Sequence, residues 1–564
     1  NSNNSVRITD EFMRAYLNDG KWQTRFRTNG DVHETFQAKD LMDQIAFAAW
    51  ACADPGVQFD TTINDWHTCA NTDRIHASNP CSEYMFLDDS ACNLSSINVM
   101  KYLRPDGSFD VEGFRHTARV FITAMDILVD YASYPTEQIT RNSHMYRPLG
   151  IGYANLGSLL MVSGIPYDSP QASAVCSALT AILTGHAYRT SAEIAASKSP
   201  FPDYKKNESS MIRVIEKHRA AAHKISEEHC WKELLVAAHE DWEDAFEIGK
   251  LYGYRNAQVS VIAPTGTIGL LMDCDTTGIE PDFALVKFKK LAGGGYFKII
   301  NQCVPAALHK LGYSESEIQN IIEYIQGTSR LEGTPWINRE TLKAKGFTAE
   351  ELDKIDVMLP SVFDLSFAFT KWTLGEETLK RLGFKPEDYN HLRFNVLEAL
   401  GFSKSEIIEA NNIVCGMMTI EGAPLLKPEH LPVFDCANKC GKYGKRFIEP
   451  MTHVRMMAAA QPFISGAISK TVNLPHESTV EEIEKIYVES WKMGLKAVAL
   501  YRDGSKLSQP LNTKSGDSAA DKKSDKKAEL QTVHPPVLQR KRLPKKRDGI
   551  TVESRVGGQK IYLR

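Results

Sequence analysis

The sequence predicts an α/β protein, in which helices are interleaved with short buried strands. Helical periodicity is clearest in Val111–Ala132, where apolar residues recur three and four positions apart. The strand-like runs are much shorter. One apolar run starts at residue 257 and leads through a Pro-Thr-Gly-Thr turn into a second run ending at residue 273, and another is Ala497–Tyr501.

The remaining elements follow from local signals. Residues 1–50 are predicted to be helical, with Thr9 capping an acidic first turn. Residues 56–100 are broken by Asn, Asp, Pro and Ser, which predicts loops and strands. Further helices are predicted over 150–250, in short pieces over 315–410 with starts at Ser314 and Ser403, and at 450–466 and 478–494.

Composition divides the chain into three parts. Residues 1–512 have the mixed composition of one folded domain. Residues 513–549 are predicted to be a disordered linker, rich in Lys, Asp, Ser and Ala and ending in a basic run. This run is interpreted as a solvated linker end rather than a nucleic-acid patch. Residues 550–564 alternate in polarity and predict the first hairpin of a further domain.

Overall composition excludes several classes of protein. The 564 residues are 43% hydrophobic with a net charge of −4, which gives no reason to expect nucleic-acid binding. No apolar run approaches the roughly 18–20 residues that span a bilayer. Eleven cysteines without a secretion signal favour the reducing cytoplasm. The start without methionine and the strand-like end predict a piece of a longer protein.

The strongest chemical signal is the segment Asn79–Leu94. Asn79, Cys81 and Glu83 alternate, so in an extended segment their side chains would share one face. A carboxylate beside a thiol raises the pKa of the thiol, which disfavours a thiolate nucleophile and favours a neutral sulfur that exchanges a hydrogen atom. Cys92 could return to the same pocket. On spacing alone, a loop with two unrelated buried thiols is the favoured interpretation.

Asn79-Pro80-Cys81-Ser82-Glu83 followed by Ala91-Cys92-Asn93-Leu94 resembles the catalytic finger loop of ribonucleotide reductases. Other segments resemble this family in the same order and cover about residues 4–512. They are Tyr146–Gly152, Ala263–Gly269, Thr277–Pro281, Ala467–Pro475 and Gly494–Gly504. The resemblance implies the family's ten-stranded α/β barrel with a central finger loop, its early strands preceding Asn1.

The resemblance also implies roles for individual residues. Cys81 would carry a transient thiyl radical that abstracts the 3′ hydrogen of the ribose, and Glu83 would take the 3′-OH proton. Asn79 would hold the ribose hydroxyls. Cys92 would be half of the dithiol that supplies the electrons. Pro80 and Ser82 complete the substrate-binding loop. The radical must be kept from water, which an enclosed loop achieves.

The turn Pro264-Thr265-Gly266-Thr267-Ile268 is predicted to bind the substrate diphosphate. Its backbone N–H groups and the hydroxyls of Thr265 and Thr267 could donate to phosphate oxygens. Considered alone, such a turn is more often only a turn. The resemblance to the family's phosphate loop favours the binding interpretation.

The radical source is inferred from the segment Lys496–Gly504. Reductases served by a diiron subunit carry adjacent tyrosines there, whereas Ala499 and Leu500 stand in these places. The resemblance therefore implies the adenosylcobalamin-dependent class. The alternatives are a diiron-partnered large subunit, with Tyr501 in the relay, and a non-catalytic nucleotide-binding relative. A thiol–disulfide oxidoreductase is disfavoured because no C-x-x-C motif is present, and Arg555–Gly558 reads as a hairpin turn rather than a glycyl-radical motif.

Metal ligands are not predicted. Cys436 and Cys440 form a C-x₃-C pair without a second pair, and His67 with Cys69 lacks a third ligand. The resemblance implies a ribonucleoside diphosphate substrate and a thioredoxin-like or dithiol reductant. It also implies nucleotide effectors acting through a region before Asn1, and it allows a homodimer. The redox partner of Cys92 is expected before Asn1 and a tail dithiol after Arg564, so this chain alone is not expected to turn over.

Overall fold

A computed structural model describes residues 4–290, 296–391, 394–505, 511–512, 552–556 and 559–563. The chain separates into two units, Asn1–Ser515 and Gly516–Arg564. In the second unit, β12 (Val552–Val556) and β13 (Gln559–Leu563) pair as an antiparallel hairpin. The predicted linker 513–549 and the predicted glycine turn at 557–558 lie outside the described residues.

One sheet of the first unit has the strand order β1-β4-β10-β9. Its strands are β1 (Ser5–Ile8), β4 (Gly56–Phe59), β10 (Ala497–Arg502) and β9 (Thr471–Leu474). β1 is parallel to β4, β10 is antiparallel to β4, and β10 is parallel to β9. Segments from both ends of the chain therefore form one sheet, and the predicted strand at 497–501 is confirmed.

A second set of parallel strands runs beside the first. β5 (Asn93–Asn98) pairs with β6 (Leu149–Ala154). Single parallel bridges then join Ile151 to Ser260 and Ile262 to Ile468, which leads directly into β9. The segments 258–262 and 466–469 thus continue the sheet between β6 and β9. The described residues form a mixed α/β structure but no closed ten-stranded barrel.

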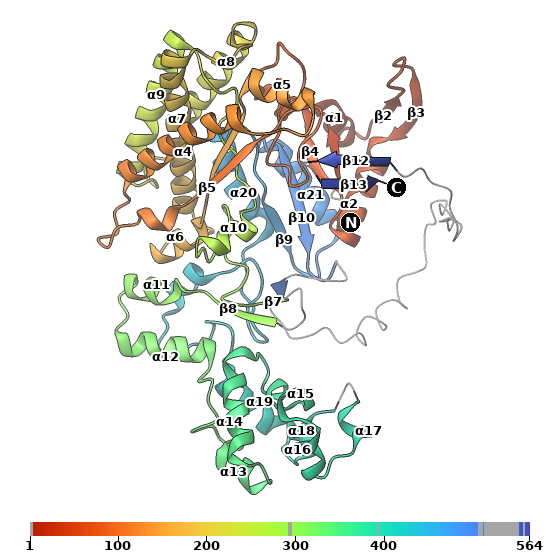
Figure 1. Ribbon diagram of the computed structural model, residues 1–564, viewed down its shortest axis with the longest axis vertical. Helices are drawn as coiled ribbons and strands as arrows, with labels where there is room; N and C mark the ends of the chain where they lie inside the picture. Colours follow the sequence, from red (N-terminus) through yellow and green to blue (C-terminus); the bar gives the residue numbers. More distant parts are fainter. Residues whose placement is uncertain are drawn as a thin grey trace. The chain divides into compact units, whose positions relative to one another are not determined.

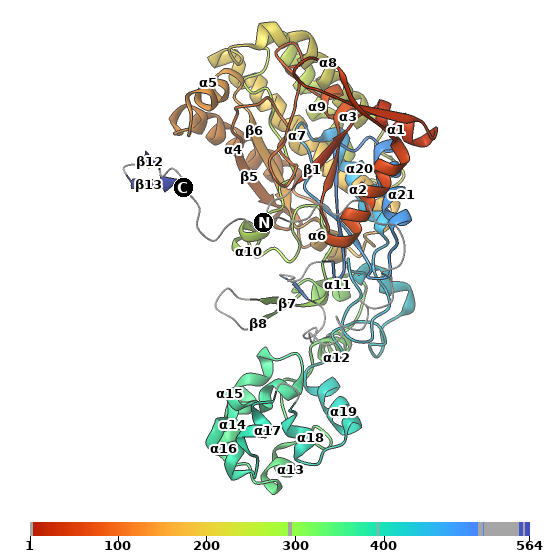
Figure 2. The same cartoon turned by 90° about the vertical axis from the view of Figure 1, so that its right-hand side faces the viewer.

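Long helices cover the strands. α4 (Val111–Tyr131), α7 (Pro170–Lys198), α8 (Tyr204–Ala222) and α9 (Lys232–Tyr252) lie together in Figure 1. α7 is buried on nearly all sides because its sequence is apolar around the whole circumference. Figure 2 shows α2 (Ala38–Cys52) beside α21 (Val480–Lys492), two helices from opposite ends of the chain.

Residues from about 284 to 440 build a separate hydrophobic core. It is mostly helical. Ser314 and Ser403 each form a capping box at the start of a helix, which confirms both predicted starts. Its main elements are β7 (Val286–Lys290), β8 (Tyr296–Ile300), α11 (Val304–Lys310), α12 (Glu315–Gln326), α13 (Arg339–Ala344), α14 (Ala349–Met358), α15 (Lys371–Leu374), α16 (Glu376–Arg381), α17 (Pro386–Tyr389), α18 (Val396–Ala399) and α19 (Lys404–Val414).

The N-terminal prediction was only partly right. Thr9 caps α1 (Asp10–Leu17) as expected, but β2 (Lys21–Arg25) and β3 (Val32–Gln37) form an antiparallel hairpin within the predicted helical region. The remaining elements are α3 (Asp60–Asp65), η1 (Val99–Tyr102), α5 (Glu137–Tyr146), α6 (Leu156–Val162), α10 (Gly266–Leu271), η2 (Leu359–Ser361), η3 (Leu365–Phe369), η4 (Pro428–Phe434), α20 (Pro450–Ala460), η5 (Gln461–Phe463) and β11 (Leu511–Asn512). Across the described ranges, no helix is both long and apolar enough to cross a membrane.

Candidate active site

The segment between residue 78 and β5 is a loop, called here the Cys81 loop (residues 78–92). The sequence predicted an extended run at Asn79–Glu83, and this local geometry was wrong. The backbone turns instead: Ser82 adopts a left-handed φ of 65°, and its N–H donates to the carbonyl of Asn79 at 3.1 Å. Asn79 Oδ1 also accepts from the N–H of Tyr84 at 3.0 Å, which closes the turn. Local hydrogen bonds to an Asn side chain favour such turns over a strand.

The side chains of Cys81 and Glu83 differ in their exposure to solvent. Cys81 is exposed, whereas Glu83 is 3% exposed. Partial burial of the sulfur, and then the nearby Glu83 carboxylate, raise the pKa of the Cys81 thiol, which disfavours the thiolate at neutral pH. A thiol of raised pKa and a buried carboxylate thus lie in the same turn, although the two side chains do not share a strand face.

Glu83 is held through its backbone rather than its carboxylate. Its carbonyl accepts the N–H of Ala467 at 2.7 Å. Its Oε2 is buried and has no hydrogen-bond partner among the residues that the structure describes. An unpaired buried carboxylate oxygen is costly, and such groups in native proteins call for a functional explanation. The arrangement leaves this oxygen free to accept a proton from a substrate.

Cys92 immediately precedes β5 and lies close to Gly150 on β6. A Cβ added to Gly150 would lie 2.6 Å from Cys92 Sγ and 3.1 Å from the side chain of Val261. A Cβ added to Gly466 would likewise lie 2.7 Å from Val261 and 3.0 Å from the Glu83 carbonyl. Val261 thus lies near both Gly150, which is next to Cys92, and Gly466, which is next to the Glu83 carbonyl. The two glycines let the Cys81 loop pack closely on the strands.

The surroundings of Cys92 favour the protonated thiol over the thiolate. Burial, and then the charge of Glu83, raise its pKa. Burial and Cys92 also raise the pKa of Tyr84 well above its usual value, and the Tyr84 hydroxyl lies 2.8 Å from Ser90 Oγ. The charge of Glu83 therefore adds to the effect of burial in raising the pKa of both thiols. Two protonated thiols around one buried carboxylate suit hydrogen-atom and proton transfer.

The predicted phosphate turn follows the strand segment that contains Val261. Thr265 has a left-handed φ of 49° and precedes the short helix α10. Its hydroxyl oxygen accepts the N–H of Gly278 at 2.8 Å, so Thr265 is partly committed to holding the turn. Pro264, Gly266, Thr267 and Ile268 are exposed. The first N–H groups of α10 have no acceptor within a helix and point outward from its end.

On β10, Ala499 is exposed and Leu500 is buried, so the two predicted relay positions carry no phenol. The hydroxyl of Tyr501 is buried and has no hydrogen-bond partner within the described ranges. Burial, followed by the charge of Asp503, raises the pKa of Tyr501 to about 12.

The suspected metal residues have other surroundings. His67 uses Nε2 toward the carbonyl of Asp73 at 3.0 Å and Nδ1 toward the N–H of Cys69 at 3.4 Å. Cys436 and Cys440 are buried in the second core, and their thiols donate to the carbonyls of Phe434 at 3.5 Å and Asn438 at 3.7 Å. In the part of the chain that is described, no three His, Cys, Asp or Glu side chains cluster as metal ligands would.

Sequence reasoning missed two buried polar residues near the Cys81 loop. Gln58 on β4 is 5% exposed and donates from Nε2 to Ser78 Oγ at 2.7 Å and Ser82 Oγ at 2.9 Å. Lys496 is 2% exposed and donates from Nζ to the carbonyls of Ser465, at 3.1 Å, and of Gly466. A polar residue inside an apolar strand is the signal that could have drawn attention to Gln58.

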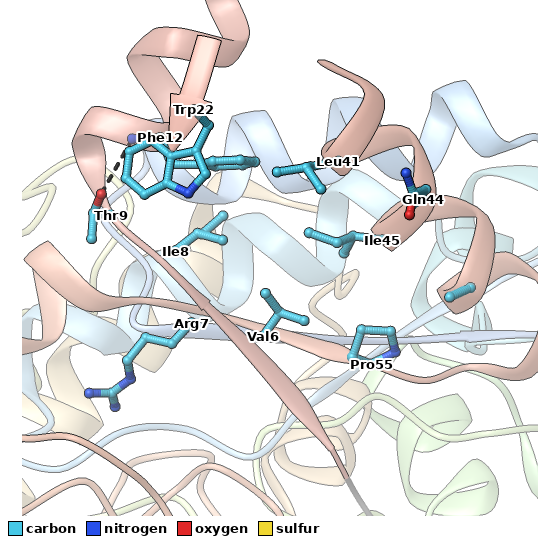
Figure 3. Close-up of a pocket in the computed structure, with 11 residues that line it drawn as sticks. Val6, Arg7, Ile8, Thr9, Phe12, Trp22, Leu41, Gln44, Ile45 and Pro55 are labelled. Atoms are coloured by element: carbon cyan, nitrogen blue, oxygen red, sulfur yellow. Dashed lines mark hydrogen bonds between the residues drawn. The ribbon is translucent and has the colours of Figure 1, made fainter. Parts of the chain in front are cut away.

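An apolar groove of about 390 Å³ lies along β1, between α1, β2 and α2 (Figure 3). Val6 and Ile8 point into it together with Trp22, Leu41 and Ile45. None of the predicted site residues lines this groove, so it is separate from the Cys81 loop.

Fold and site together define an α/β core with two thiols of raised pKa and a buried carboxylate. The family described as ribonucleotide reductase, barrel domain, matches residues 1–358 and 385–501. The chain therefore belongs to this family of ribonucleotide reductase barrel domains.

Curated relatives agree with this membership. The chain is 52% identical over 600 residues to a vitamin B12-dependent ribonucleotide reductase of Bradyrhizobium diazoefficiens, covering 100% of this chain and 48% of that protein. It is 46% identical to a protein of the same name from Rhodopirellula baltica, covering 100% of this chain and 46% of the relative. A vitamin B12-dependent ribonucleoside-diphosphate reductase of Mycobacterium tuberculosis is 27% identical over 91% of this chain and 53% of its own length. The chain spans about half the length of these relatives.

Proposed function

We propose that the full-length protein containing this chain reduces ribonucleoside diphosphates to 2′-deoxyribonucleotides by a thiyl-radical mechanism. The observation that carries the proposal is the exposed, protonated thiol of Cys81 beside the buried, unpaired carboxylate oxygen of Glu83. The relatives named as B12-dependent ribonucleotide reductases support it. The name of the M. tuberculosis relative supports a diphosphate substrate.

In this proposal, Cys81 as a thiyl radical takes the 3′ hydrogen atom of the ribose. Glu83 Oε2 accepts the 3′-OH proton, and the dithiol that includes Cys92 supplies the proton with which the 2′-OH departs as water. Asn79 Oδ1 is engaged by Tyr84, so its NH₂ group is the part that would bind the ribose hydroxyls. Cys92 and a partner cysteine outside this chain lose two hydrogens to form a disulfide. One dithiol is thus oxidised for each water and deoxynucleotide formed.

Pro264–Ile268 would bind the diphosphate through the exposed N–H groups of Gly266, Thr267 and Ile268. Thr267, which is exposed, would add a hydroxyl donor, and Thr265 would mainly hold the turn. The strand segment 258–262 leads into this turn and contains Val261. Val261 packs near Gly150, beside Cys92, and near Gly466, beside the Glu83 carbonyl. The phosphates of a nucleotide could in this way bind the turn that follows segment 258–262, and its ribose could bind the Cys81 loop packed on that segment.

Adenosylcobalamin is the proposed radical source. The residues fit this group: Cys81 is exposed, and Ala499 leaves an exposed position of β10 without a bulky side chain. When bound, the cofactor supplies a carbon-centred radical that can remove a hydrogen atom from a thiol. The chain's contribution is to keep Cys81 protonated and accessible. The proposal extends to a ten-stranded barrel around the Cys81 loop, completed by strands outside this chain.

Residues 1–512 would form the catalytic part, 513–549 a linker and 550–564 the start of a further domain. The proposed partners are a thioredoxin-like or small dithiol reductant, nucleotide effectors bound outside this chain, and a second copy in a homodimer.

Reduction of CDP by the full-length protein with a dithiol is expected to require adenosylcobalamin. The reason is that Ala499 and Leu500 cannot pass a radical from another subunit. The measurement is dCDP formation with the cofactor, without it, and with a diiron subunit in its place. Tyr501, with its buried unpaired hydroxyl, favours the diiron-partnered alternative. Activity with the diiron subunit alone would establish that alternative and contradict the cobalamin assignment.

A further inference from the structure

The side chain of Gln58 joins the Cys81 loop to the sheet. Gln58 lies on β4, with Cα partners Arg7 on β1 and Ala497 on β10. It is therefore in the middle of three hydrogen-bonded strands, where its backbone is fixed. Its side chain leaves the sheet and reaches the loop on both sides of Cys81.

Both hydrogens of the Gln58 amide are used. Nε2 donates to Ser78 Oγ at 2.7 Å and to Ser82 Oγ at 2.9 Å. Ser78 precedes Asn79 and Ser82 follows Cys81, so these two bonds span the Asn79-Pro80-Cys81 turn. Ser78 Oγ donates its own hydrogen to the carbonyl of Asn79 at 2.8 Å, and can therefore only accept from Gln58.

Arg7 determines which way the amide faces. Its Nε and Nη2 donate to Gln58 Oε1 at 3.4 and 3.3 Å. A guanidinium group has only donors, so the amide must present its oxygen to Arg7 and its NH₂ to the serines. Arg7 is itself bound by Asp60 at 3.3 Å and by the carbonyl of Ile75. Figure 3 shows Arg7 pointing away from the apolar groove that Val6 and Ile8 line, as alternation along β1 requires.

We propose that Gln58, oriented by Arg7, is a positioning residue that fixes the turn carrying Cys81 relative to the sheet. Its amide has no unused hydrogen-bonding capacity, since two donors and two acceptor sites are all engaged. The hydrogen bonds of the Gln58 amide go to Arg7, Ser78 and Ser82 and not to the proposed reacting groups, Cys81 and Glu83. It acts on the reaction only through the loop, and this role rests on the proposed function.

Gln58→Glu is the decisive variant because it keeps the size and the Arg7 contact but removes both donors. The carboxylate would then face the lone pairs of Ser78. In the full-length protein, kcat for CDP with adenosylcobalamin is expected to fall about 10- to 100-fold, since small misplacements of reacting groups cost this much. KM is expected to change much less. Gln44→Glu, an exposed glutamine on α2, is the matched control and should keep the kcat of the unaltered protein.

Hydrogen exchange tests the same idea without any activity. The N–H groups of Ser82 and Tyr84 bond to Asn79 within the turn, so their exchange rates report its opening. Gln58→Glu should accelerate exchange at both positions and leave the β5–β6 amides unchanged. Unchanged exchange at Ser82 and Tyr84, or an unchanged kcat, would overturn the proposal.

The two measurements distinguish a failure of the proposed function from a failure of the role assigned to Gln58. If the unaltered protein does not reduce CDP, the proposed function fails, while the exchange experiment still decides the role of Gln58. If Gln58→Glu does not fold, Ser78→Ala removes the hydroxyl that accepts from Gln58 and donates to the carbonyl of Asn79, without touching the buried strand. It should shift exchange and kcat in the same direction by a smaller factor, and exchange rates equal to those of the unaltered protein would contradict the inference.

Discussion

Replacing Glu83 by glutamine is expected to lower kcat for CDP reduction about 10²- to 10⁴-fold, the usual contribution of a general acid or base. Glutamine has nearly the same size, and the backbone bond from Ala467 to the carbonyl of residue 83 does not involve the side chain. The loop should therefore keep its shape. The variant loses the ability to accept the 3′-OH proton at a buried oxygen that has no other partner in the described residues. It also loses the charge that adds to the effect of burial in raising the pKa of Cys81 and Cys92.

Thermal unfolding gives the second half of this prediction. Because Glu83 buries a carboxylate without a compensating bond on Oε2, the glutamine variant should be at least as stable as the unaltered protein. Glu351→Gln is the contrasting control: this buried glutamate is paired with Arg381 and Thr378, so its loss should reduce stability and leave kcat unchanged. A Glu83→Gln enzyme with full kcat would remove Glu83 from the mechanism.

Replacing Lys496 by methionine is expected to change how stability depends on pH. Burial, and then the charge of Lys217, lower the pKa of Lys496 to about 7. In the unfolded chain this lysine titrates near its usual value of about 10.4. Between these two values the unfolded state binds more protons, so the free energy of unfolding rises with pH by up to about 1.4 kcal/mol per pH unit. The methionine variant lacks this contribution.

The measurement is the free energy of unfolding of both proteins between pH 7 and pH 10. The difference, unaltered protein minus variant, should increase with pH by a total of a few kcal/mol at most. His67 and His218 also lie near Lys496, but burial lowers the pKa of each, to about 4 and about 3, below this range. Lys492→Met removes an exposed lysine and should give a flat difference. A flat difference for Lys496→Met would mean that the lysine keeps an ordinary pKa.

Local signals predicted much of the secondary structure. Thr9, Ser314 and Ser403 were recognised as helix starts because an N-cap depends only on the next three residues. The hairpin of β2 and β3 was missed although Asn29-Gly30 lies in its turn, a common hairpin signal. The turn at Ser82 was also missed, because alternation was given more weight than the tendency of Asn79 to bond to nearby backbone.

The site could be predicted as a set of residues but not as a geometry. Asn79, Cys81, Glu83 and Cys92 stand out by their chemistry within one short segment. The contacts that hold them come from distant parts of the chain: Gln58 from β4, and Ala467 next to β9. These contacts depend on strand order and register, which local sequence patterns do not contain. The roles of the site residues and of the phosphate turn remain predictions that the experiments above address.

The most direct test compares the full-length protein with its Cys81→Ala variant. Both are supplied with CDP, a dithiol and adenosylcobalamin, and dCDP is measured. We expect dCDP from the unaltered protein and none from the variant, which lacks the sulfur that must carry the radical. The variant should fold normally because Cys81 is exposed. Formation of dCDP by Cys81→Ala at the rate of the unaltered protein would contradict the account.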